Sequence, residues 1–217
     1  STATVATPAP ASDLRPFLTA CAELERTGTP VLATIRLTVD GGRWPRDREQ
    51  ERLPWFREAL EVASWVDVEV ESAIASEVVR LARTRGRHII ISHHDFAGTP
   101  EALELTAVIA RARDLAGDVV KVATAIRSLD DHARLLDLLR RQLLMTTGGG
   151  PLALVGMGPL GTSLRSYLPA IGSRLTYGYL DAIAAPGQIP ARDLVERLLV
   201  DCPPYAEGRL PPAKGGR

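Results

Sequence analysis

Short apolar runs alternate with amphipathic segments along most of this chain. Six runs are rich in β-branched or other apolar residues and predict strands at 31–37, 66–71, 88–94, 118–124, 151–157 and 173–179. Between them apolar residues recur with helical spacing, which predicts helices at about 13–26, 55–64, 71–85, 100–116, 128–144, 161–171 and 190–200. Ser12 or Asp13 can cap the first of these helices. The pattern therefore predicts an α/β protein in which strands and helices alternate.

Strict alternation implies parallel strands joined by right-handed crossovers, either in an open doubly wound sheet or in a (β/α)8 barrel. Polar residues fall at or just beyond the predicted strand ends: Arg36, Glu69, His94, Lys121 and Arg165. In a barrel these side chains would converge on the face that carries the active site, whereas an open sheet would spread them along an edge. We favour the barrel.

The punctuation of the chain predicts one main domain. Residues 1–12 are small and Pro-rich, which predicts a flexible lead-in, and 41–54 form a polar loop. The barrel domain is predicted to span 13–202, followed by a Pro/Gly-rich tail at 203–217.

Composition excludes several classes of protein. Lys+Arg and Asp+Glu both number 26 in 217 residues, which argues against a nucleic-acid or membrane-surface protein. No apolar run approaches the roughly 20 residues of a membrane span, and residues 1–12 do not resemble a signal peptide. Two cysteines, Cys21 and Cys202, are too few for a disulfide scaffold or a structural zinc site, so we expect a cytoplasmic protein.

Lysine is rare in this chain and one lysine lies in an apolar strand. Of the 26 Lys and Arg residues only two are lysines, Lys121 and Lys214, and Lys121 lies in the segment DVVKVAT. Burial disfavours an ammonium and lowers its pKa, as an amine that attacks a ketone to form a Schiff base requires. The alternative is a structural lysine that is paired with Glu69 or Glu71.

The segment ISHHDF places two histidines at the end of a strand. Neighbouring strand residues face opposite ways, so one of His93 and His94 is expected to point into a barrel, where its pKa near neutrality suits a general base. Only His88 and His132 remain as further histidines, which is a poor ligand set, so we expect no metal. A histidine beside an amine nucleophile is more informative than either residue alone.

Gly156-Met-Gly158-Pro-Leu-Gly161 matches the dinucleotide-binding pattern GxGxxG, with Asp181 further along. That pattern usually belongs to the first strand–helix unit of its domain, whereas several strands precede it here. Pro159 also removes a backbone donor. We therefore interpret the segment as a glycine-rich turn, with a nucleotide-binding oxidoreductase as the alternative.

Together these segments resemble type I 3-dehydroquinate dehydratase. The matching stretches are TIRLTVDGG (34–42), VDVEVE (66–71), IISHHDFAGTP (90–100), DVVKVAT (118–124), GMGPLGTSLR (156–165), RLTYGYLDAIAAPGQ (174–188) and ARDLVERLL (191–199). The resemblance implies a (β/α)8 TIM barrel of the class I aldolase type without a cofactor or metal. It implies the syn elimination of water from 3-dehydroquinate to give 3-dehydroshikimate, in the shikimate pathway of aromatic amino acid biosynthesis or a related secondary pathway.

The resemblance also implies roles for individual residues. Lys121 would form the imine with the substrate ketone, and His94 would move the protons. Asp40 lies where the family has a glutamate that assists this histidine. The substrate would be bound by Arg36, Glu69, Arg165 and Gln188.

The chain departs from the family at several positions. Leu164 and Ala184 stand where the family has serines, and the family's first two strands have no match, so six of eight strands can be read. We consider a truncated chain, a late start, a second copy that completes the barrel as a homodimer, and a degenerate relative. The alternative function is accordingly a catalytically impaired relative that binds a shikimate-like ligand or a partner chain.

Overall fold

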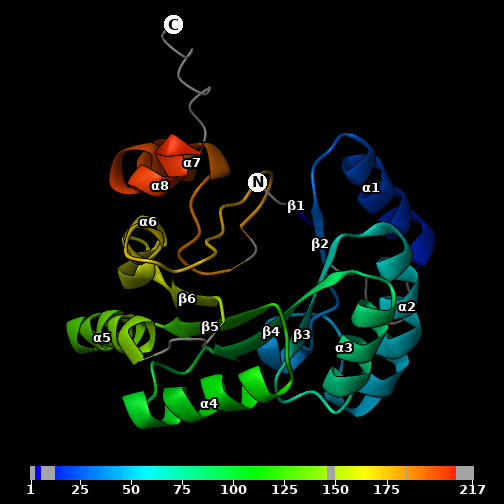
Figure 1. Cartoon of the computed structure of the whole chain (residues 1–217), viewed down its shortest axis with the longest axis horizontal. Helices are drawn as coiled ribbons and strands as arrows, with labels where there is room; N and C mark the ends of the chain where they lie inside the picture. The colour runs from blue at the N-terminus through cyan, green and yellow to red at the C-terminus, as the bar shows by residue number, and fades with distance from the viewer. Residues whose placement is uncertain (1–2, 6–12, 146–149, 184, 209–217) are drawn as a thin grey trace, which may run out of the picture. The chain divides into compact units, whose positions relative to one another are not determined.

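A computed structural model describes the chain except for residues 1–2, 6–12, 146–149, 184 and 209–217. Strands and helices alternate (Figure 1), which confirms the predicted α/β class. The strands are β1 (Ala3–Val5), β2 (Val31–Thr34), β3 (Trp65–Glu69), β4 (His88–Asp95), β5 (Val119–Ala125) and β6 (Leu152–Met157). The α-helices are α1 (Leu14–Arg26), α2 (Arg52–Val62), α3 (Ala75–Thr84), α4 (Ala102–Asp114), α5 (Leu129–Met145), α6 (Leu164–Ala170), α7 (Ala191–Asp201) and α8 (Pro203–Glu207). Short 3-10 helices are η1 (Thr38–Asp40), η2 (Arg46–Glu51) and η3 (Pro159–Gly161).

The strands form one sheet in the order β1-β2-β3-β4-β5-β6, so each strand pairs with the next strand of the chain. The pairs β1–β2, β2–β3 and β3–β4 are parallel, as strand–helix alternation requires. Every residue of β6 and all but the last residue of β5 is buried, in accord with their nearly continuous apolar sequences.

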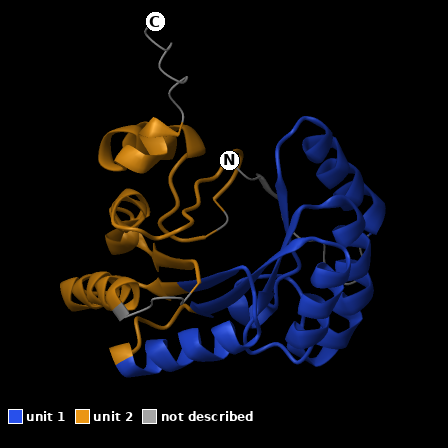
Figure 2. Ribbon diagram, viewed as in Figure 1, with its two compact units in different colours: residues 1–94, 103–122 blue, residues 95–102, 123–217 orange. Residues whose placement is uncertain are grey.

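The chain divides into two compact units, residues 1–94 with 103–122 and residues 95–102 with 123–217 (Figure 2). In the first unit, α1, α2 and α3 pack in sequence order and α2 and α3 cover β3. Asp13 caps α1, because its carboxylate accepts a hydrogen bond from the Arg15 amide at 3.0 Å. In the second unit α5 and α6 pack on β6, and α7 packs on α6.

Two predictions about strands differ from the structure. No strand was predicted before residue 13, but β1 pairs with β2 from Ala3↔Val31 to Val5↔Ala33. The predicted strand 173–179 is wrong: it forms only a single bridge, between Tyr179 and Pro190. Gly178 lies so close to the start of α7 that a Cβ there would be 2.7 Å from Ala191 Cα, so this segment turns back onto α7.

Candidate active site

Lys121 lies in the middle of β5 and its side chain is buried, with 7% of the residue exposed. Its Nζ lies 3.0 Å from Oδ2 of Asp67, a β3 residue. Burial is the largest influence and lowers the pKa of Lys121; Asp67 opposes this and the Arg36 cation adds to it. The lysine is therefore paired, but with Asp67 rather than with the Glu69 or Glu71 that the sequence offered as partners.

Asp67 links three side chains from different segments. Its Oδ2 also lies 2.8 Å from Arg36 Nη2, and its Oδ1 accepts a 2.5 Å hydrogen bond from Ser92 Oγ of β4. Burial favours the neutral acid, but Arg36 and Lys121 hold the pKa of Asp67 below its ordinary value. A buried, ionised carboxylate therefore lies between two buried cations, an arrangement typical of functional sites.

His94, near the end of β4, is the histidine that turns inward. Its Nδ1 lies 3.5 Å from Oδ1 of Asp40, the last residue of η1. Burial, together with the charges of Arg36 and Lys121, lowers the pKa of His94 well below its ordinary value, so the imidazole is neutral near pH 7. Burial and the nearby Glu69 raise the pKa of Asp40 to about 6. A neutral imidazole beside a carboxyl group can accept a proton.

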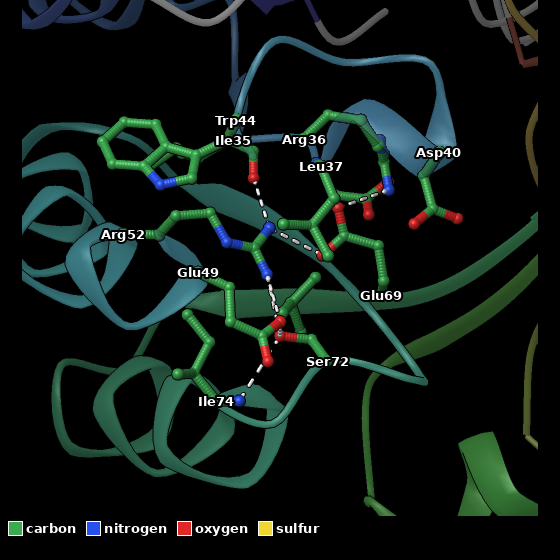
Figure 3. A network of polar contacts seen from close by, with 12 residues as sticks. Ile35, Arg36, Leu37, Asp40, Trp44, Glu49, Arg52, Glu69, Ser72 and Ile74 are labelled. Carbon is green, nitrogen blue, oxygen red and sulfur yellow. Dashed lines mark hydrogen bonds and ion pairs between the residues drawn. The ribbon is translucent and has the colours of Figure 1, made fainter. Parts of the chain in front are cut away.

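Glu69, the last residue of β3, is fully buried and its carboxylate is bound by protein groups (Figure 3). Its Oε1 accepts a hydrogen bond from the Leu37 amide at 2.9 Å and lies 3.6 Å from Arg36 Nη1. Its Oε2 accepts a 2.7 Å hydrogen bond from Arg52. Burial opposes the charge of Arg36, but Asp67 and Glu69 outweigh this effect and raise the pKa of Arg36 above its ordinary value.

Arg165 and Gln188 belong to the second unit. The Arg165 guanidinium is buried and donates to three carbonyl oxygens: Nε to Gly187 at 2.6 Å, Nη1 to Tyr177 at 3.0 Å and Nη2 to Pro186 at 3.0 Å. Burial lowers the pKa of Arg165 to about 10, since carbonyl dipoles compensate a cation less than a carboxylate does. The Gln188 Oε1 accepts a hydrogen bond from the Ala185 amide at 3.1 Å.

The GxGxxG segment is a tight strand-to-helix turn. A Cβ on Gly161 would lie 2.6 Å from the backbone carbon of Gly156, so these two glycines allow close backbone packing. The Gly158 amide donates to Pro186 O at 3.1 Å, which ties the turn to the 185–188 loop. This geometry agrees with the interpretation of the segment as a glycine-rich turn.

Two other histidines, His93 and His132, contact side chains other than Lys121, Asp67 and Asp40. His93 Nδ1 is 2.8 Å from Oε1 of the partly exposed Glu71, and Nε2 of the half-buried His132 lies 3.3 Å from Ser163 Oγ. Within the described ranges, no group of three or more His, Cys, Asp or Glu side chains is arranged to hold a metal ion.

The structure thus brings five of the predicted residues together in the first unit: Arg36, Asp40, Glu69, His94 and Lys121. Sequence reasoning missed Asp67, Ser92 and Arg52. Asp67 precedes Glu69 by two strand positions and so shares its face, a signal that could have identified it. The position of Ala184 lies outside the described residues, and Leu164 is buried in α6.

Comparison with known proteins gives one consistent result. A family model described as type I 3-dehydroquinase matches residues 11–201. The chain is 34% identical over 180 residues to the 3-dehydroquinate dehydratase of Methanosarcina acetivorans, covering 80% of this chain and 72% of that protein. It is 36% identical over 171 residues to the enzyme of the same name from Thermococcus gammatolerans, covering 78% and 76%.

Solved structures agree. The 3-dehydroquinate dehydratase of Geobacillus kaustophilus superposes with a TM-score of 0.75 at 27% identity, covering 87% of this chain and 74% of that one. The type I enzyme of Clostridium difficile, solved with covalently modified comenic acid, gives a TM-score of 0.76 at 26% identity over 90% and 77%. Among the described residues, no helix is both long enough and apolar enough to cross a membrane. The chain belongs to the type I 3-dehydroquinase family.

Proposed function

We propose that this chain dehydrates 3-dehydroquinate to 3-dehydroshikimate through a Schiff base on Lys121, as a hydro-lyase of the shikimate pathway or a related secondary pathway. The observation that carries the proposal is the buried Lys121, whose pKa is lowered by burial and whose Nζ lies 3.0 Å from Asp67. Such an amine loses its proton more readily than an exposed lysine does, and the free amine is the nucleophile. We infer the substrate, 3-dehydroquinate, from the family to which the chain belongs.

The free amine of Lys121 would attack the substrate ketone, and the proton that the lysine released would return through His94 to the departing oxygen, so that water leaves and a protonated imine remains. The iminium nitrogen would take the place of the ammonium and keep its positive charge near Asp67. Because Asp67 is ionised and immobilised by Arg36 and Ser92, it can stabilise this charge without reorganising. The iminium withdraws electrons and acidifies the carbon next to it.

His94 would remove the proton from that carbon, because its imidazole is neutral. The electrons form an enamine, which expels the hydroxyl group while His94 returns the proton, so that water leaves and the imine forms again. Asp40, 3.5 Å from Nδ1, would orient the ring. Hydrolysis of the imine then releases 3-dehydroshikimate and restores Lys121.

Substrate binding is proposed for Arg36, Glu69, Arg165 and Gln188. Arg36 and Arg165 are suited to an anionic carboxylate, since each is a buried cation. Glu69 would act mainly through Arg36, because its two oxygens accept bonds from Leu37 and Arg52. We place the enzyme in the cytoplasm, where its buried free thiols Cys21 and Cys202 would stay reduced.

The test is to incubate the protein with 3-dehydroquinate and borohydride and to locate the adduct by peptide mass spectrometry. Only two lysines occur in the chain, so the adduct is expected on Lys121 and absent from Lys214. Lys121→Met should abolish both the adduct and the enone absorbance of the product, whereas Lys214→Met should keep both. Full enone formation by Lys121→Met would refute the mechanism.

The alternative is a catalytically impaired relative that binds a shikimate-like ligand or a partner chain. The observations that favour it are Asp40 and Leu164, which stand where the resemblance places a glutamate and a serine. Calorimetric binding of 3-dehydroquinate without turnover would support this alternative, and turnover at ordinary enzyme rates would exclude it. Size-exclusion chromatography with light scattering tests the proposed homodimer.

A further inference from the structure

Arg52, the first residue of α2, is fully buried within the first unit (Figure 3). Its Nη1 donates to Ile35 O and to Glu69 Oε2, both at 2.7 Å, and its Nη2 donates to Ser72 Oγ at 2.7 Å. Arginine is almost never fully buried unless it is paired. These contacts join α2, the end of β3 and the segment after β2.

The contacts of Arg52 fasten the chain on both sides of Arg36. On one side Arg52 binds the carbonyl of Ile35 directly. On the other side it holds Glu69, whose second oxygen accepts the amide of Leu37 at 2.9 Å. The backbone that carries the Arg36 side chain is therefore held before and after that residue.

A hydrogen-bonded turn over residues 36–44 fixes Asp40 relative to Arg36. The Trp44 amide donates to Arg36 O at 3.1 Å, and the Thr38 amide donates to Trp44 O at 2.8 Å. Gly42 packs directly against Arg36, since a Cβ there would lie 2.1 Å from the Arg36 carbonyl oxygen. Asp40 lies inside this turn, so its place opposite His94 depends on where residues 35–37 are held.

We propose that Arg52 is a positioning residue for the dehydration, acting through Glu69 and the 35–37 backbone to aim Arg36 at Asp67 and Asp40 at His94. This inference rests on the proposed function. The planar guanidinium is suited to the task because it donates in fixed directions to two or more acceptors at once. A lysine would keep the charge beside Glu69 but lose the fixed directions.

The first variants to test are Arg52→Met and Arg52→Lys, assayed at a temperature where circular dichroism shows each protein to be folded. Arg87→Met is the matched control. Arg87 lies just before the first residue of β4, at the opposite end of that strand from His94, and its guanidinium donates to the carbonyls of Leu60 and Glu61. We expect kcat to fall about 10- to 100-fold in Arg52→Met, by analogy with small misplacements of catalytic groups. Arg52→Lys should recover part of this loss, and Arg87→Met should lose none.

A second comparison separates positioning from general stability. In Arg52→Met/Glu69→Gln both charges of the Arg52–Glu69 pair are gone, so the melting temperature should recover in part relative to Arg52→Met while kcat stays low. The recovery is partial because Arg36 loses Glu69 and Glu49 loses Arg52 as an ion-pair partner. If Arg52 acts through Glu69, the double variant should be no slower than the slower single variant. Borohydride with 3-dehydroquinate should still label Lys121 in all of these proteins, because the 3.0 Å contact between Lys121 and Asp67 involves neither Arg52 nor Glu69.

The outcomes distinguish this proposal from the proposed function. A wild-type protein without turnover or adduct refutes the function and the positioning role with it. An active wild type whose folded Arg52 variants have kcat within about twofold of Arg87→Met refutes only the positioning role. If Arg52→Met does not fold, Arg52→Lys decides in the same way, since it keeps the buried charge.

Discussion

Replacing Asp67 by asparagine would test the electrostatic basis of the site. Asparagine keeps the shape of the side chain, so the change removes mainly the charge that lies 3.0 Å from Lys121 and 2.8 Å from Arg36. Removing one partner of a buried ion pair typically costs about 3–5 kcal/mol, because the other charge stays buried without compensation. We expect Asp67→Asn to lose free energy of unfolding in this range at pH 7.

The loss should depend on pH through Lys121. Burial and Arg36 already lower its pKa, and Asp67 is the group that opposes them, so the folded-state pKa falls further in the variant. Where the unfolded chain binds a proton that the folded chain does not, stability rises with pH, by up to about 1.4 kcal/mol per unit. In Asp67→Asn this rise begins at a lower pH than in the wild type and ends near the unfolded pKa of about 10.4.

The assay is urea unfolding followed by circular dichroism between pH 7 and 9 at constant ionic strength. The deficit of Asp67→Asn should shrink as the pH rises. Asp118→Asn is the matched control: Asp118 pairs with Arg83 at 2.9 Å and accepts from the Ile89 amide, but its side chain is 24% exposed. We expect this control to lose about 1–2 kcal/mol, equally at every pH. An Asp67→Asn deficit that does not change over this range would refute the assignment of Lys121 as its buried counter-ion.

Three further changes have defined outcomes. Asp40→Asn should stabilise the protein by as much as about 3 kcal/mol at pH 7.5 and by much less at pH 4.5, as measured by urea titration. The reason is that the folded-state pKa of Asp40 is raised to about 6, so the wild type loses stability as the pH rises from about 4 to 6. The kcat of the same variant should fall. Gly161→Ala should lower the free energy of unfolding by about 1–3 kcal/mol, since the added Cβ would lie 2.6 Å from the Gly156 backbone. The control Gly98→Ala has open space around the added Cβ and should change stability by less than about 0.5 kcal/mol, with both variants measured by thermal unfolding. Arg165→Met should release the 185–188 loop, because it removes the hydrogen bond to Pro186 O, and amide exchange in the loop should become faster. Addition of NAD should leave the melting temperature of the wild type unchanged, because the Gly158 amide is already bound to Pro186 O.

The fold was most predictable where many consecutive residues carried the same pattern. The apolar runs of β2 to β6 and the helical spacing of α1 to α5 each extend over enough residues to outweigh local ambiguity. By contrast β1 has only three residues, and its pairing with Val31–Ala33 is a long-range contact that no local pattern records. Segment 173–179 has two tyrosines and a threonine, but its backbone hydrogen bonds go to separate parts of the chain. The Arg174 amide donates to Leu152 O of β6, whereas Tyr179 exchanges hydrogen bonds with Ile189 and Ala191.

The site was predictable to the extent that rare residues marked it. Lys121 was conspicuous because lysine is scarce, and His94 because it ends a strand. Arg52 lies among alternating charges in RDREQER, and periodicity does not reveal which of these is buried. Its burial is decided by Glu69, 17 residues further along the chain, so only the tertiary structure identifies it.

In the proposed mechanism, the charges of the site are consistent with one order of events. Before attack Lys121 must lose its proton, which burial and Arg36 promote and Asp67 resists. Once the proposed imine forms, its nitrogen would be positive again and Asp67 would stabilise it, so the carboxylate that slows the first step would favour the second. Burial lowers the pKa of His94, and the charges of Arg36 and Lys121 lower it further. An iminium at the position of the Lys121 nitrogen would keep that positive charge, so the ring would stay neutral. The base is therefore ready for the substrate proton at the stage when the iminium makes that proton acidic. An Asp67 variant should accordingly form the trapped adduct at lower pH than the wild type but convert it to product more slowly.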